Sequence, residues 1–135
     1  MSKRQHLYFY YSNLLLEVRQ VTVFYETENG ERPIEEFIFS LDEKMQAKFV
    51  GLIDLLEVNG TNLREPYSKH LEDGIFELRC KVGNNISRAM FFFYYNQRIV
   101  FTNAFIKKTK KTPRNEIRLA KERRKKYMQK EENNG

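Results

Sequence analysis

The sequence is poor in the residues that build disulfides, metal centres and membrane spans. Among its 135 residues are one cysteine, two histidines and no tryptophan. A single cysteine, Cys80, excludes an internal disulfide, and one cysteine with two histidines does not make a metal site. No apolar run approaches the roughly 18 residues that a membrane-spanning helix needs. We therefore expect no metal, no cofactor and no membrane partner.

Glycine-rich and nucleophilic motifs are also missing. Gly83-Asn84-Asn85 reads as a turn rather than as a phosphate-binding loop. Nothing resembles a serine or cysteine triad. The adjacent carboxylates of Glu72 and Asp73 read as solvated groups beside a turn, so the sequence offers no familiar catalytic constellation.

Positive charge is concentrated in the C-terminal third of the chain. The formal net charge is +6. Residues 101–130 hold twelve Lys or Arg and two acidic residues, whereas residues 1–100 hold twelve basic and fourteen acidic residues. Such a field attracts polyanions, either nucleic acid or an acidic protein partner. The alternative is a solvated lysine-rich helix that serves solubility.

Hydrophobic patterns predict an α+β domain. Residues 21–25 read as a first strand, and Pro33 suits the start of a short helix. A second helix is expected from a capping box at residues 40–43 to about Val58, and Asn59-Gly60 ends it. These two helices are expected to pack as an N-terminal pair across one face of a sheet.

The rest of the sheet is expected after a polar run. Further strands are predicted at residues 75–82, 86–95 and 98–106, which makes an antiparallel sheet of about four strands. The polar run before them, residues 67–74, reads as a loop. A C-terminal helix is predicted from Pro113, with Thr112 as its N-cap, to about Met128.

Basic residues gather around the predicted sheet edge. Lys107, Lys108, Lys110 and Lys111 lie between a strand and a helix start, so they are not simply one helix face. The N–H groups that begin the following helix add positive potential there.

Two arginines lie on the predicted strands. Arg88 lies in an otherwise apolar strand, where burying a charge is costly, so we expect it to face a groove or a phosphate. Arg79 lies on the polar face of its strand, where it either joins that surface or pairs with Glu77.

Several segments, in this order and spacing, carry a family pattern: VFY at 23–25, NG at 29–30, PIEEF at 33–37, YSKHLEDGIFELR at 67–79, FIKKTKKTP at 105–113 and E-I-x-x-A at 116–120. Together they resemble the phage-derived, HigB-like branch of the RelE/ParE toxin superfamily, over roughly Val21 to Tyr127. The resemblance implies a RelE-like fold in residues 21–130, preceded by an N-terminal extension at 1–20 and followed by a polar tail at 131–135.

The resemblance also implies a function. The implied protein is a cytoplasmic toxin of a type II toxin–antitoxin pair. Its implied activity is that of a metal-independent endoribonuclease, which cuts mRNA on the 70S ribosome and so inhibits translation. In the family reaction the ribose 2′-OH attacks the adjacent phosphate and the 5′-oxygen leaves. A cognate antitoxin is implied, of the HigA-like helix-turn-helix kind. Two alternatives stay open: a ParE-like inhibitor of DNA gyrase, and an inactive relic that only binds an antitoxin.

Site residues follow from the same resemblance. Catalytic roles are implied for Arg79, Arg88 and Lys107, and His70 is either a general acid or base or a cap on the loop before its strand. RNA or ribosome binding is expected of Lys69, Lys108, Lys110, Lys111 and Arg114. RelE itself has a tyrosine in the C-terminal segment, where this chain reads Glu116-Ile117-Arg118. The group that moves the proton therefore stays open between His70 and a lysine.

Overall fold

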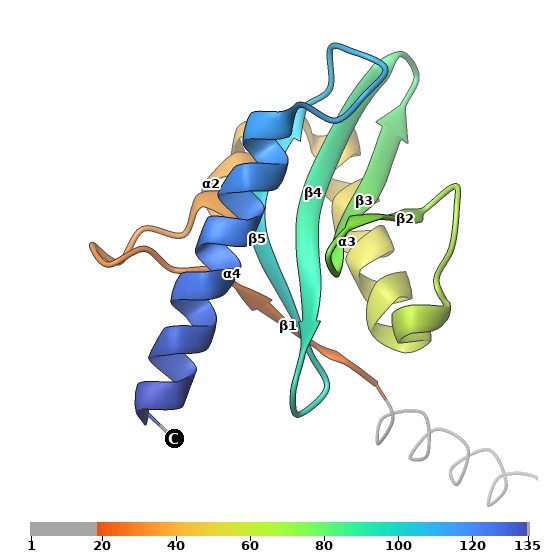
Figure 1. Ribbon diagram of the computed structural model, residues 1–135. Helices are drawn as coiled ribbons and strands as arrows, with labels where there is room; N and C mark the ends of the chain where they lie inside the picture. The colour runs from red at the N-terminus through yellow and green to blue at the C-terminus, as the bar shows by residue number, and fades with distance from the viewer. Residues whose placement is uncertain (1–18, 135) are drawn as a thin grey trace, which may run out of the picture.

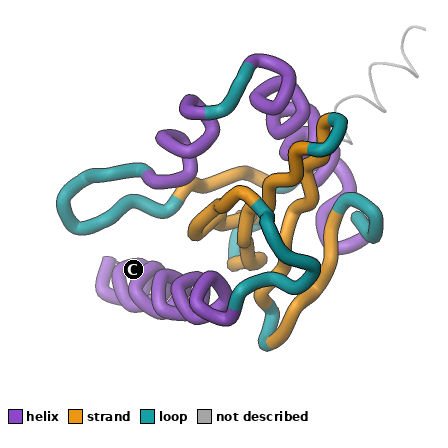
Figure 2. Tube along the Cα trace, turned by 90° about the horizontal axis from the view of Figure 1, so that it is seen from above, coloured by secondary structure: helices purple, strands orange, loops and turns teal. Residues whose placement is uncertain are grey.

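A five-stranded sheet with helices on both faces forms the fold, in a computed structural model that describes residues 19–134 (Figure 1). The elements in chain order are β1 (Val21–Phe24), α2 (Pro33–Ser40), α3 (Glu43–Asn59), the 3-10 helix η1 (Gly60–Asn62), β2 (Ser68–Glu72), β3 (Ile75–Val82), β4 (Asn85–Tyr94), β5 (Arg98–Ile106) and α4 (Arg114–Asn134). Seen along the sheet, α2 and α3 cover one face and α4 covers the other (Figure 2). The expected N-terminal extension falls almost wholly outside the described residues.

The sheet differs from the expected four antiparallel strands in two ways. Its order is β1-β5-β4-β3-β2, and β1 runs parallel to β5, so the sheet is mixed. The polar run before β3, expected to be a loop, contains an additional strand, β2, which pairs antiparallel with β3 and brings the number of strands to five. An edge strand buries little of its length, so β2 lacks the apolar pattern that marks an inner strand. Helices α2 and α3 follow β1, in the order that the sequence predicts, so they are not strictly an N-terminal pair.

Helix α3 begins two residues later than its predicted capping box. Ser40 is the last residue of α2, and its hydroxyl donates to the carbonyl of Phe37 at 2.6 Å. The N-cap is Asp42, whose carboxylate accepts the N–H of Met45 at 2.8 Å. Serine and aspartate are both good N-caps. Because Ser40 still belongs to α2, Asp42 is the residue that caps α3. At its other end, Gly60 stops the helix with φ 54°, as predicted.

Two hydrophobic clusters hold the layers together. One lies between the sheet and the helices α2 and α3, and it includes the fully buried Phe49, Leu56 and Phe91. Cys80 is buried in the same cluster, as predicted, and burial raises the pKa of its thiol to about 11. The other cluster packs Ile117 and neighbouring residues of α4 against β3, β4 and β5. Each face of the sheet is therefore closed by its own core.

Helix α4 continues to Asn134, beyond the predicted end near Met128. Its last turns are attached to the start of β5. The guanidinium of Arg98 donates to the Tyr127 hydroxyl at 2.8 Å and pairs with Glu131 at 2.9 Å. These contacts extend a helix whose sequence is otherwise almost entirely polar. In the part of the chain from residue 19 to 134, no helix has both the length and the apolar content to cross a membrane.

Candidate functional site

A fully buried carboxylate, Glu77, lies at the centre of the basic residues. Its residue is 1% exposed, on the face of β3 that α4 covers. The Arg79 Nε–H donates to Glu77 Oε1 at 3.1 Å, and the Thr112 hydroxyl donates to Oε2 at 2.5 Å. The Arg88 Nε lies 3.6 Å from the same Oε1. One carboxylate thus links two strands to the loop that precedes α4.

Arg79 and Arg88 are direct partners in the pairing of β3 with β4. Like charges directly opposite each other destabilise a sheet. The negative charge of Glu77, which pairs with both arginines, offsets the repulsion between them. Arg88 is 8% exposed, and it donates from Nη1 to the carbonyl of Ser87 at 3.1 Å. Within the described residues its Nε has no hydrogen-bond partner. Burial lowers the pKa of Arg88, an effect that the charge of Glu77 opposes.

Two lysines complete this group. Lys107 follows β5, and its backbone N–H donates to the carbonyl of Ile86 at 2.8 Å. Burial and then the charge of Arg88 lower the pKa of Lys107, and the charge of Lys69 adds to this. Lys69 is the register partner of Glu77 on β2. We call Lys69, Arg79, Arg88 and Lys107 the basic cluster.

The loop between β5 and α4 carries the remaining predicted lysines. Lys108, Lys110 and Lys111 are all exposed. The loop extends past the end of the sheet beside the β3–β4 turn (Figure 1). Thr112 is not the N-cap that the sequence predicts, because α4 begins at Arg114, two residues later; its hydroxyl donates to the Glu77 carboxylate instead. The loop is therefore anchored at the basic cluster.

His70 lies apart from this cluster. It pairs with Phe76 across β2 and β3, and the two ring centroids are 5.0 Å apart. Phe76 packs on the α2–α3 side of the sheet, opposite the face of Glu77. The His70 Nε2 accepts the backbone N–H of Gly74 at 3.1 Å, which holds the turn between the two strands. Of the two roles left open for His70, this geometry matches the cap and places the ring away from the arginines.

Arg114, predicted to bind RNA, is engaged at the side of the fold. It pairs with Glu72 at the end of β2. Lys121 pairs with the same carboxylate and also with Asp73, at 2.7 Å. Hydrogen bonds from Arg114 and then Lys121 lower the pKa of Glu72 from about 4.5 to about 2. This clamp fastens the first half of α4 to the β2–β3 turn.

Because the pKa of Glu72 is lowered, we expect the ion pairs of Glu72 with Arg114 and Lys121 to make the stability of the fold sensitive to acid. A carboxyl whose pKa is lower in the folded than in the unfolded state stabilises the fold above its unfolded pKa, and that stabilisation is lost as the pH falls. The thermal midpoint of Glu72→Gln should therefore lie below that of the wild type at pH 6, and the gap should close between about pH 4.5 and 2. Glu132→Gln, an exposed change on α4, is the control. A gap that persists at pH 2 would contradict the lowered pKa.

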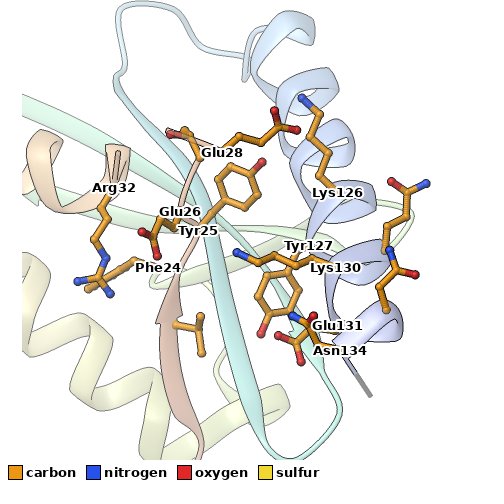
Figure 3. A pocket seen from close by; sticks show the side chains of 14 residues that line it. Phe24, Tyr25, Glu26, Glu28, Arg32, Lys126, Tyr127, Lys130, Glu131 and Asn134 are labelled. Carbon is orange, nitrogen blue, oxygen red and sulfur yellow. The ribbon is translucent and has the colours of Figure 1, made fainter. Parts of the chain in front are cut away.

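A groove of about 560 Å³ lies between the β1–α2 loop and the C-terminal half of α4 (Figure 3). Its lining includes three acidic and three basic side chains: Glu26, Glu28, Glu131, Arg32, Lys126 and Lys130. This balance gives the groove no preference for a polyanion. Nor do residues 19–134 place three His, Cys, Asp or Glu side chains where they could share a metal ion.

Comparison with known proteins points to one family. Residues 36–125, more than half of the chain, match the family model described as "Phage derived protein Gp49-like (DUF891)". The match includes all four residues of the basic cluster, together with Glu77 and Thr112. Among curated proteins, none matches the chain.

Proposed function

Because this chain belongs to the phage-derived Gp49-like family, a family of RelE/HigB-type toxins, we propose that it is the toxin of a type II toxin–antitoxin pair and cuts mRNA on the ribosome. The family match confirms the phage-derived toxin resemblance, and the specific HigB type belongs to this proposal. The observation that carries the nuclease activity is the basic cluster around the buried Glu77.

The cluster suits cleavage of a phosphodiester without help from a bound group. As the ribose 2′-OH attacks, it loses its proton to solvent water, the 2′-oxygen–phosphorus bond forms, the bond to the 5′-oxygen breaks, and negative charge grows on the phosphate oxygens. Arg79 and Arg88 offer guanidinium N–H groups to these oxygens, and pre-placed donors of this kind supply much of the acceleration in such reactions.

Proton transfer falls to Lys107 in this proposal. A general acid works best when its pKa is near the working pH, and burial beside Arg88 lowers the pKa of Lys107 in that direction. We assign it the protonation of the departing 5′-oxygen. His70 receives no role in the chemistry because its ring lies on the other face of the sheet.

Binding to the ribosome is assigned to the exposed lysines of the loop before α4. Lys110 and Lys111 extend the field of the basic cluster beyond the sheet, where ribosomal RNA would meet them. The partner antitoxin, which the family implies, is proposed to be a HigA-like helix-turn-helix protein. An acidic segment of it would neutralise the same lysines, so salt would weaken the complex.

Induction in bacteria without the antitoxin tests the function. We expect growth to stop and new RNA 5′-ends to appear within translated regions, because the proposed substrate is mRNA on the ribosome. A reporter whose start codon is destroyed should stay uncut. Lys44→Ala, an exposed change on α3 across the sheet from the basic cluster, should leave both effects intact.

Two results would contradict the nuclease proposal. Unchanged growth and unchanged 5′-ends would identify an inactive relic that only binds an antitoxin. Arrested growth with intact mRNA, together with lost supercoiling by DNA gyrase, would identify the ParE-like alternative instead.

A further inference from the structure

Both oxygens of the Glu77 carboxylate are occupied. Oε1 accepts from Arg79 Nε at 3.1 Å and lies 3.6 Å from Arg88 Nε. Oε2 accepts from the Thr112 hydroxyl at 2.5 Å. A carboxylate that is 1% exposed and held from both sides keeps one orientation. Glu77 therefore fixes, at a single point, groups from β3, from β4 and from the loop before α4.

We propose that Glu77 is the positioning residue of the nuclease site: it aims Arg79 and Arg88 at the phosphate and, through Thr112, latches the lysine-bearing loop against them. The inference rests on the proposed function. Glu77 is not itself the base, because its oxygens are buried and already accept hydrogen bonds, so a ribose hydroxyl has no access to them.

The charge of Glu77 acts in two opposite directions. It holds the two arginines, which face each other across the strand pair, in defined positions. It also cancels part of the positive field that attracts RNA. A residue that serves orientation at the expense of attraction should affect the rate of cleavage and the strength of binding in opposite senses.

Glu77→Gln separates these two effects, since glutamine keeps the shape and removes the charge. The assay is cleavage of mRNA on programmed ribosomes with the full-length protein in excess, over a range of protein concentrations. We expect the maximal rate to fall by about 10- to 100-fold, the range that small misplacements of reacting groups produce. The half-saturating concentration should stay equal or fall. An unchanged maximal rate would overturn the inference.

Thr112 provides a matched pair that leaves the buried charges alone. Thr112→Val removes the hydroxyl at constant shape and should slow the maximal rate by about tenfold, within the range for a lost positioning contact. Thr112→Ser keeps the hydroxyl and should cleave like the wild type. Thr112→Ser should keep the thermal midpoint of the wild type, whereas Thr112→Val should lower it by a few degrees, because the buried Glu77 Oε2 loses its hydrogen-bond donor; the rates are therefore compared well below both midpoints. Equal rates for valine and serine would contradict the latch, even where Glu77→Gln fails to fold.

Failure of the function is distinguishable from failure of this inference. A wild-type protein that never cuts mRNA would overturn the nuclease proposal and the role of Glu77 with it. A wild-type protein that cuts, alongside variants that cut equally well, would overturn only the role of Glu77 and Thr112.

Discussion

Phe91→Ala is expected to lower the free energy of unfolding by about 3–5 kcal/mol, the usual cost of removing a buried phenylalanine. Phe91 is 0% exposed on β4. Its ring centroid lies 5.4 Å from those of Phe76 and Phe101 and 5.6 Å from that of Phe93. Alanine would lose the burial of the ring and leave a cavity between the sheet and α3. Urea unfolding at constant slope measures the change.

Phe39→Ala is the matched control for this prediction. Phe39 is 76% exposed at the end of α2, so the same side chain is removed without opening a cavity. Its effect should stay within about 0.5 kcal/mol, as for most surface changes. If Phe91→Ala behaved like this control, the aromatic contacts on β4 would not be the centre of that core.

The strands that bury a regular pattern could be predicted closely. Both bounds of β3 and of β5 agree with the sequence prediction, and β4 starts and ends one residue earlier than predicted. In these strands apolar positions alternate or run continuously between turn residues, and that pattern follows directly from burial. The buried stripe of α3, with Met45, Phe49, Leu52 and Leu56, follows from helical spacing for the same reason.

The topology of the sheet could not be read in this way. Strand β2 is an edge, and its exposed polar residues resemble a loop. Strand β1 has four residues, too few to indicate a direction, and its partner β5 comes only after α2, α3 and three further strands. The pairing partner and direction of a strand depend on which elements meet in space. A local sequence pattern does not contain that information.

The candidate site was predicted in part. The sequence singled out Arg88 because a charge in an apolar strand is costly, and the structure buries it beside Glu77. Glu77 itself alternates with Arg79 and Lys81, which reads as an ordinary solvated face. Its burial needs β4 on one side and the loop before α4 above it. The sequence also does not predict β2 as a strand. It therefore does not place His70 and Lys69 on opposite faces of the sheet.

Arg88→Ala should have the largest effect on cleavage. Loss of one pre-placed donor to a developing charge typically costs about 10²- to 10³-fold in rate, and Arg88 also influences the pKa of Lys107. Ribosome-dependent cleavage at saturating protein measures the loss. Arg88→Lys keeps the charge but lacks the planar guanidinium, so its cleavage rate should lie between those of the wild type and Arg88→Ala. Arg118→Ala, an exposed change on α4, should cleave normally.

Stability must be separated from chemistry at Arg88. Removing it leaves the buried Glu77 carboxylate with one fewer cation, at a cost of about 3 kcal/mol, the lower end for a broken buried pair because the 3.6 Å contact is not a hydrogen bond. The double variant Arg88→Met with Glu77→Gln removes both charges and should recover much of that stability. It should not recover cleavage, because no guanidinium faces the phosphate from β4. Cleavage restored in the double variant would mean that Arg88 serves only to neutralise Glu77, and the phosphate-binding role would then rest on Arg79 and Lys107 alone.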